Sequence, residues 1–198
     1  MALAISHDVE FYESQRFPAP AIAKFVGEGL AADENVVVVT SLAHTLAIEH
    51  ELGKAGSRTH ERAKAFFVDT NTMSRALLLG QAVENVIERY LAPIVRHARE
   101  YSKNGRVRIY GELSDAMMRL YRPEIAIALE QQGAQMLMDG KTRIRCGYSE
   151  NAFPDASFAK HFTRICLLHT HVRTDLKDRN DWRFKLAEGI EEARSGEI

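Results

Sequence analysis

The chain has 198 residues, of which 45% are hydrophobic and 27% are charged. This composition predicts one globular domain with a sizeable core and excludes a disordered chain. Because 26 basic residues face 27 acidic ones, the net charge is -1, and the basic excess typical of nucleic-acid binding is missing. No apolar run approaches the ~20 residues of a membrane span, and the first residues lack the pattern of a signal peptide. We therefore expect a cytoplasmic protein that contacts neither nucleic acid directly nor a membrane.

Short β-rich runs alternate with longer helical runs along the chain, which is typical of an α/β domain with a mostly parallel sheet. The run at 35–40 is expected to be the central strand, because its unbroken β-branched residues suit a strand buried on both faces. We expect a three-layer α/β/α sandwich. The five expected strands cover residues 9–13, 35–40, 65–69, 106–110 and 142–146. The six expected helices cover about 18–30, 42–54, 83–101, 125–138, 157–171 and 181–194.

The longest expected helix, 83–101, carries a continuous apolar stripe at helical spacing. Pro93 lies inside that stripe. Proline has no amide hydrogen and its ring clashes with the preceding turn, so we expect a kink or a split there.

A phosphate-binding loop is missing from the place where such a domain would carry it. Residues 14–20, between the first expected strand and helix, contain no glycine, and Pro18 and Pro20 cannot donate an amide hydrogen. The GxGxxG pattern does not occur either. We therefore expect no nucleotide cofactor and no ATPase activity.

The densest group of potential metal ligands is His169 and His171. The segment looks helical, and helical residues two apart diverge by about 200°, so the pair would need distant ligands such as His7, Asp69 or Glu112. We expect no metal, with one histidine packed or hydrogen-bonded and the other solvated.

Cys146 and Glu112 each lie at the carboxyl end of an expected strand, where open α/β sheets form ligand crevices. Cys146 is interpreted as a buried thiol in preference to a nucleophile, since cysteine is often buried and no GxSxG elbow exists. Cys166, 20 positions further on, is also interpreted as a buried thiol. Glu112 has two open interpretations, a ligand or base at the crevice, or an acid at the N-terminus of the next helix.

Three tyrosines, Tyr12, Tyr110 and Tyr148, also lie at or near strand ends. They are either the aromatic wall of a site for a small, fairly apolar ligand or ordinary aromatic residues of the sheet.

An ordered set of segments carries a family resemblance. The segments are 7–13, 29–40, 107–113, 129–130, 146–148 and His169. Together they make the chain resemble the MEDS family, named for the methanogen/methylotroph, DcmR sensory domain, over about residues 5–172. The resemblance implies a degenerate relative of the KaiC/RecA-like ATPases that has lost the phosphate loop. It also implies a sensory role, often beside a histidine kinase or a DNA-binding module, with a small organic ligand.

The residues at the family's recurring positions are the ligand-site candidates that the resemblance implies. They are His7, Tyr12, Glu112, Cys146, Tyr148 and His169.

We divide the chain into a MEDS-like domain, 1–172, and an amphipathic helical tail, 173–198. In the tail Trp182, Leu186 and Ile190 recur every four residues and form an apolar stripe. This stripe is expected either to dock a kinase or a second protomer, or to pack on its own domain.

The leading hypothesis is a non-catalytic cytoplasmic sensory domain that binds a small organic ligand or a signalling partner such as a histidine kinase or a transcription regulator. The alternative is a small-molecule or nucleotide enzyme in which Glu112, Cys146 and His169 converge at the sheet edge. A third hypothesis is an interaction protein whose crevice between Tyr12 and Tyr148 is filled.

Overall fold

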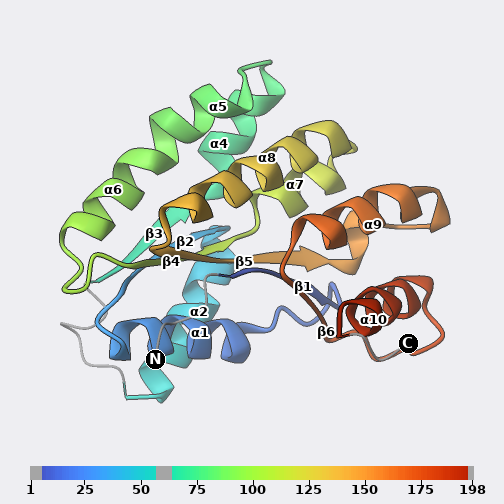
Figure 1. Cartoon of the computed structure of the whole chain (residues 1–198), viewed down its shortest axis with the longest axis horizontal. Helices are drawn as coiled ribbons and strands as arrows, with labels where there is room; N and C mark the ends of the chain where they lie inside the picture. Colours follow the sequence, from blue (N-terminus) through green and yellow to red (C-terminus); the bar gives the residue numbers. More distant parts are fainter. Residues whose placement is uncertain (1–5, 57–63, 196–198) are drawn as a thin grey trace.

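The computed structural model describes residues 6–56 and 64–195. Within them one sheet has six strands, all parallel, in the order β3-β2-β4-β5-β1-β6 (Figure 1). The expected α/β fold with a parallel sheet is confirmed. The strands are β1 (His7–Tyr12), β2 (Asn35–Thr40), β3 (Ala65–Asp69), β4 (Val107–Gly111), β5 (Thr142–Ser149) and β6 (His171–Thr174).

Helices cover both faces of the sheet and make the three expected layers. The smaller layer contains α1 and α2, and the larger contains α4 to α9 (Figure 1). The helices are α1 (Ala19–Ala31), α2 (Leu42–Lys54), α4 (Thr70–Leu78), α5 (Val83–Val86), α6 (Ala92–Glu100), α7 (Leu113–Arg119), α8 (Pro123–Met136), α9 (Ala159–Leu168) and α10 (Trp182–Ser195). Among the residues that the structure describes, no helix is both long enough and apolar enough to cross a membrane.

The central strand β2 is buried along its whole length, as its β-branched run predicts. Its side chains alternate between the two faces. Val37 and Val39 join the core under the larger helical layer, whereas Val36 and Val38 join the core under α1 and α2. A polar residue in any strand is therefore assigned to one face by its parity alone.

An irregularity is present next to Pro93, although residues 83–100 stay helical without a break. The segment divides into α5, a π-helical turn η1 (Ile87–Leu91) and α6, and Pro93 lies in the first turn of α6. Because proline donates no amide hydrogen to the preceding turn, it fits the point where the π-helical turn changes to the α-helix α6. The wider turn places Ile87 and Leu91 side by side on the core face, where both contact the larger core.

The helix expected over 157–171 is wrong at its end. α9 ends at Leu168, and 171–174 form the sixth strand, β6, which pairs in parallel with β1. Its four residues include one apolar side chain, so its sequence carries almost no strand pattern. The pairing with β1 decides the conformation. The short helices α4 and α7 were also not expected, and β5 runs on to Ser149 instead of ending at Cys146.

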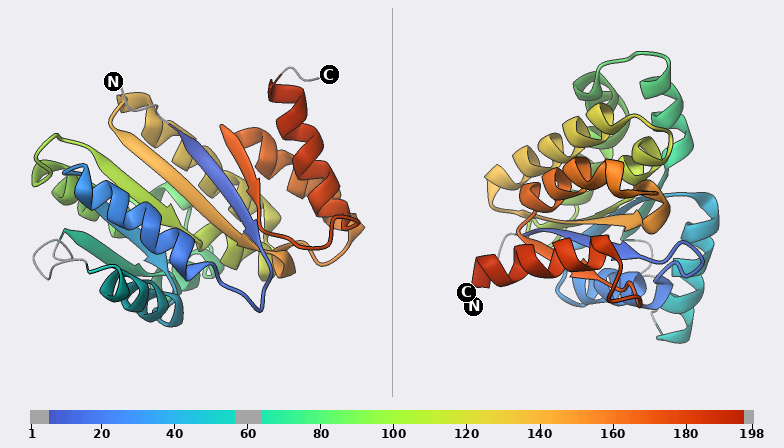
Figure 2. Two further views of the ribbon diagram at one scale, coloured as in Figure 1. Left: turned by 90° about the horizontal axis from the view of Figure 1, so that it is seen from below. Right: turned by 90° about the vertical axis from the view of Figure 1, so that its right-hand side faces the viewer.

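The tail folds back on the domain as α10, beside β6 and α9 (Figure 2). The side chains of Trp182, Leu186 and Ile190 are half-buried against the larger core, and the Trp182 ring centroid is 5.5 Å from that of Phe162. Of the two outcomes expected for the apolar stripe, the structure has the one in which it packs on its own domain. Docking of a partner at these residues stays a prediction.

Candidate functional site

The first part of the site is a buried group around the carboxylate of Glu130, which we call the Glu130 cluster. It contains His7 of β1, Glu130 of α8, Cys146 and Tyr148 of β5, and His169, which follows α9. Because β1 and β5 are neighbours and Val9 pairs with Cys146, the strand residues of the cluster share one face. Each of the five residues is at most 8% exposed.

Both oxygens of the Glu130 carboxylate are used. The Tyr148 hydroxyl donates to Oε1 at 2.6 Å, and the Cys146 thiol donates to Oε2 at 3.1 Å. The Nε2 atoms of His7 and His169 lie 3.3 and 3.2 Å from the same Oε2. Behind the site, the Nδ1 atom of His169 donates to the carbonyl oxygen of Ile165 at 2.7 Å, which sets the orientation of its ring.

The electrostatics of the cluster are set by its two imidazoles. Burial acts to raise the pKa of Glu130, but His169 and His7 outweigh it and hold that pKa well below its usual range. Burial and the Glu130 charge raise the pKa values of Cys146 and Tyr148 well above their usual range. Glu130 is therefore an anion, and the thiol and the phenol keep their protons and donate to it. A protonated thiol is a poor nucleophile.

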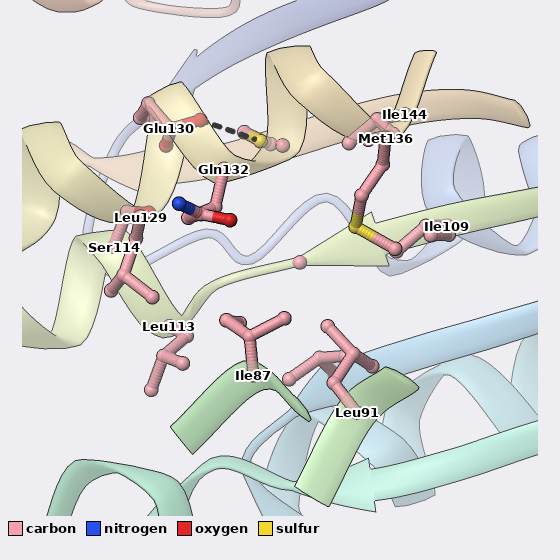
Figure 3. Close-up of a pocket in the computed structure, with 14 residues that line it drawn as sticks. Ile87, Leu91, Ile109, Leu113, Ser114, Leu129, Glu130, Gln132, Met136 and Ile144 are labelled. Atoms are coloured by element: carbon pink, nitrogen blue, oxygen red, sulfur yellow. Dashed lines mark hydrogen bonds between the residues drawn. The ribbon is translucent and has the colours of Figure 1, made fainter. Parts of the chain in front are cut away.

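Next to the Glu130 cluster lies a mostly apolar cavity of about 60 Å³. Glu130 and Cys146 form one polar end of its wall. Figure 3 shows Ile87 and Leu91 of η1 on one side and Met136 of α8 on the opposite side. The remaining wall comes from Val39, Ile109, Gly111, Leu113, Ser114, Leu129, Gln132, Gly133 and Ile144.

A second carboxylate, Glu112, lies beyond the end of β4 on the other face of the sheet. Its Oε1 accepts from the hydroxyls of Tyr12 at 2.8 Å and Tyr110 at 3.0 Å. Its Oε2 accepts from the Thr40 hydroxyl and lies 2.8 Å from Nδ1 of His44. We call these five residues the Glu112 cluster. Glu112 is also the N-cap residue of α7, so the interpretation as an acid at a helix start describes its place.

The structure therefore divides the six ligand-site candidates into two groups. His7, Cys146, Tyr148 and His169 meet around Glu130, while Tyr12 and Glu112 belong to the cluster on the opposite face. Ligand binding by these six residues remains a prediction.

Two arrangements expected from the sequence are not present. The enzyme alternative needs Glu112 to converge with Cys146 and His169, but the hydrogen bonds and ion pairs found for Glu112 in the described residues involve neither. The three tyrosines do not form one wall either. Tyr12 pairs with Ser149 and Tyr110 pairs with Arg145, and both partners lie on the opposite face of β5 from Tyr148.

The histidine pair has the expected environments, one packed and hydrogen-bonded and the other exposed, but not the expected helical backbone. His169 ends α9 in an extended conformation and is buried, whereas His171 is the first residue of β6 and is exposed. The helical geometry used against a metal at this pair was therefore wrong, because the segment is not helical. His169 finds its neighbours on other elements, and His171 is not among them.

Glu130 is the central residue that sequence reasoning did not select. A signal was available, because Ala126, Glu130 and Gly133 follow one another at helical spacing on the buried face of α8. A Cβ atom on Gly133 would lie 3.3 Å from Nε2 of His7, so the glycine makes room for that ring. An acidic residue on the apolar face of a helix, one turn from a glycine, therefore indicates that its carboxylate has a buried partner.

Comparison with known proteins agrees with the resemblance described above. The model of the MEDS family, described as the MEthanogen/methylotroph, DcmR Sensory domain, matches residues 6–170. The match includes every element from β1 to α9 and ends before α10. A search of curated proteins found no match. The chain therefore belongs to the MEDS family of sensory domains.

Proposed function

We propose that this chain is a non-catalytic cytoplasmic sensory domain that binds a small, largely apolar organic molecule in the cavity beside Glu130 and Cys146. It passes the bound state to a signalling partner such as a histidine kinase or a transcription regulator. Membership of a sensory family supports the general role. The single observation that carries the ligand is the cavity itself, with apolar walls and a buried carboxylate and thiol at one end.

The size of the cavity limits the ligand. A cavity of about 150 Å³ is needed for benzene, and this one is about 60 Å³. We expect a molecule of a few heavy atoms, or a slightly larger one that pushes the walls apart. The Glu130 carboxylate is a hydrogen-bond acceptor, so a ligand that carries one donor group would be oriented with that group toward Glu130.

The helices that form the cavity walls can transmit ligand binding to a partner. Ile87 and Leu91 belong to a π-helical turn, a feature that is frequent at functional sites and packs less regularly than an α-helix. Opposite them, Leu129 and Met136 belong to α8, which also carries Glu130. A ligand between the two segments would change the packing of α5–α6 against α8, and the partner would detect that change.

The region around the carboxyl end of β1 supports a role other than nucleotide hydrolysis. The amide of Ser14, which in a phosphate loop would be free to donate, donates to the Glu150 carboxylate at 3.2 Å. Pro18 is the N-cap residue of α1 and has no amide hydrogen. A negative carboxylate in this position repels a phosphate group. We propose that the fold is related to that of the KaiC/RecA-like ATPases and that the ATPase activity is not retained.

The test is a thermal-shift and calorimetric screen of the purified full chain with small organic molecules and with ATP plus Mg²⁺. A ligand at 100 times its Kd stabilises the folded state by about 2.7 kcal/mol. We expect a shift for a subset of small, mostly apolar compounds and none for ATP. A shift with ATP alone would overturn the proposal.

A cavity-filling variant locates the site. Gly111 lines the cavity, and a Cβ atom there would meet no atom within 4 Å, so Gly111→Val adds volume without a clash near the backbone. Gly27→Ala in α1 is the matched control, because its added Cβ also has open space but lies in the other helical layer. Binding should be lost in the first variant and unchanged in the second. Equal binding in both would move the ligand out of this cavity.

A further inference from the structure

We propose that His7, Glu130, Cys146 and His169 form a binding site for a single Zn²⁺ ion. The inference goes beyond the sensory role and does not depend on it. The four side chains offer one sulfur, two imidazole nitrogens and one carboxylate oxygen, and these four atoms all lie within 4.8 Å of one another. They come from β1, α8, β5 and the end of α9, so only the folded chain brings them together.

Four of the six separations among these atoms are close to those around a tetrahedral ion, and all six are within 4.8 Å. Zinc–ligand bonds of 2.0–2.3 Å place neighbouring ligand atoms about 3.3 to 3.8 Å apart. Here Sγ of Cys146 is 3.4 Å from Nε2 of His7 and 3.1 Å from Oε2 of Glu130. The two imidazole nitrogens are 3.3 and 3.2 Å from the same oxygen. Small outward movements of the side chains would admit the ion at the centre.

The surroundings already hold two of these ligands in the orientation that a metal needs. The bond from Nδ1 of His169 to the Ile165 carbonyl leaves Nε2 directed at the centre of the cluster, as for many metal-bound histidines. The Tyr148 hydroxyl occupies Oε1 of Glu130 and leaves Oε2 for the ion. These are the supporting contacts that commonly accompany metal ligands.

The geometry at Nε2 of His169 leaves this atom without a hydrogen bond. It is buried and lies 3.2 Å from Oε2 of Glu130, but the contact lacks hydrogen-bond geometry, and no other described residue bonds to it. A buried polar atom without a partner is costly, and native structures contain few of them. A metal ion at the centre of the cluster would satisfy it.

The donor set selects the class of ion. Magnesium and calcium prefer oxygen ligands, whereas one thiolate with two imidazoles suits zinc. When zinc binds, the Cys146 thiol loses its proton to solvent and a sulfur–zinc bond forms. Because Glu130 and Cys146 also line the cavity, the cavity is the path by which the ion would enter.

The Glu112 cluster is an internal control. It has a buried carboxylate and one histidine, but it contains no thiol and no second imidazole. Two variants with unchanged donors in the Glu130 cluster, His44→Gln and Tyr12→Phe, should therefore bind zinc like the unmodified chain.

The experiment measures metal directly in the full chain. After expression with zinc supplied, elemental analysis should find about one zinc per chain. After removal of zinc with a chelator, titration with Co²⁺ should produce the visible bands of a tetrahedral site and a near-ultraviolet sulfur-to-cobalt band. Cys146→Ser should abolish the sulfur band, and His169→Gln should weaken zinc binding at least about tenfold.

Failure of a variant to fold does not remove the test, because the unmodified chain supplies its own readout. A folded, chelator-treated chain that takes up Co²⁺ without a sulfur band, or takes up no metal, would overturn the proposal. Equal loss in His44→Gln would overturn it as well. A zinc-loaded chain that responds to no organic molecule would contradict the sensory proposal and leave the metal site standing.

Discussion

The Glu130 and Glu112 clusters are two buried carboxylates that the same sheet separates. Both accept from tyrosine hydroxyls, and both are at least nine-tenths buried. Glu112 is surrounded by hydroxyl groups and by His44, whose side chain is 31% exposed. Glu130 is surrounded by a thiol and two imidazoles that water does not reach.

The difference between the two clusters lies in the atoms that surround the carboxylate. The hydroxyls of Tyr12, Thr40 and Tyr110 donate to the two oxygens of Glu112, and these contacts connect the carboxyl ends of β1, β2 and β4. Nitrogen and sulfur atoms directed at one oxygen of Glu130, beside a cavity, form a group that can exchange its partners for a ligand or an ion.

The largest effect is expected from loss of the Glu130 charge. Glu130→Gln removes the negative charge that accepts from the Cys146 thiol and the Tyr148 hydroxyl and lies within 3.3 Å of two imidazole nitrogens. Breaking a buried charged network in this way costs about 3 to 5 kcal/mol of unfolding free energy. Glu112→Gln should cost only about 1 to 2 kcal/mol, because His44 reaches solvent and hydroxyl groups can reorient. Urea unfolding at pH 7 with a chelator present measures both. Equal losses would remove the contrast between the clusters.

Gly147 lies between Cys146 and Tyr148 of the Glu130 cluster, and it faces Tyr110 of the Glu112 cluster. A Cβ atom there would lie 2.9 Å from Cζ of Tyr110 and closer still to its hydroxyl oxygen, which is bonded to Glu112. Gly147→Ala should therefore destabilise the fold by about 2 to 3 kcal/mol. The double variant Gly147→Ala/Tyr110→Phe should recover part of the loss in urea unfolding, since it removes the nearest atom. No recovery would mean that strain in β5, and not Tyr110, causes the effect.

A third buried carboxylate, Asp115 of α7, has no imidazole among its partners in the described part of the chain and shows what burial does to the pKa of a carboxyl group without imidazoles. Burial raises the pKa of Asp115 to about 6, although it accepts from the amide and hydroxyl of Ser149 and pairs with Arg119. Because this pKa lies above the unfolded value of about 3.9, its contribution to stability is complete below pH 4 and disappears as the pH rises through 6.

The corresponding measurement is urea unfolding of the unmodified chain and of Asp115→Asn between pH 4 and pH 7. Relative to the variant, the unmodified chain should lose about 2 to 3 kcal/mol across this range. A flat difference would show that Asp115 keeps an ordinary pKa in the folded state and that burial is weaker at this end of the sheet than the structure indicates.

The smallest effect is expected from deletion of one hydroxyl in each cluster. Tyr148→Phe and Tyr12→Phe should each cost about 1 to 2 kcal/mol, because each removes one bond to a buried carboxylate. The two variants should differ in ligand binding. Only Tyr148→Phe frees Oε1 of Glu130, so only this variant should change the affinity for a cavity ligand in calorimetry. A change caused by Tyr12→Phe would place the ligand on the other face.

Much of the fold could be predicted because it depends on local sequence. The runs at 35–40 and 65–69 form the expected strands with the expected bounds, since β-branched and aromatic residues favour extended backbone in any buried setting. The irregularity next to Pro93 was also predictable, because proline acts on its own turn. β6 was not, since its conformation comes from pairing with β1, more than 150 residues earlier.

The candidate site was predictable only in part. His7, Cys146, Tyr148 and His169 were identified by their places at strand ends and in the family pattern, and the structure brings all four to one carboxylate. That carboxylate was missed because Glu130 lies in the middle of a helix, where an isolated acid is usually solvated. Its importance comes from neighbours contributed by other elements.

The layered α/β architecture, the positions of most elements and the lack of a phosphate-loop motif follow from local sequence, because they depend on side-chain periodicity and on the backbone limits of glycine and proline. Tertiary structure alone decided which polar residues meet. Strand parity and order assign each side chain to a face of the sheet, and they place Glu112 and Glu130 on opposite faces with different partners. Glu112 is thereby surrounded by hydroxyl groups and His44, whereas Glu130 lies beside a cavity among nitrogen and sulfur donors. The donors around each carboxylate are set by contact in space and not by position along the chain.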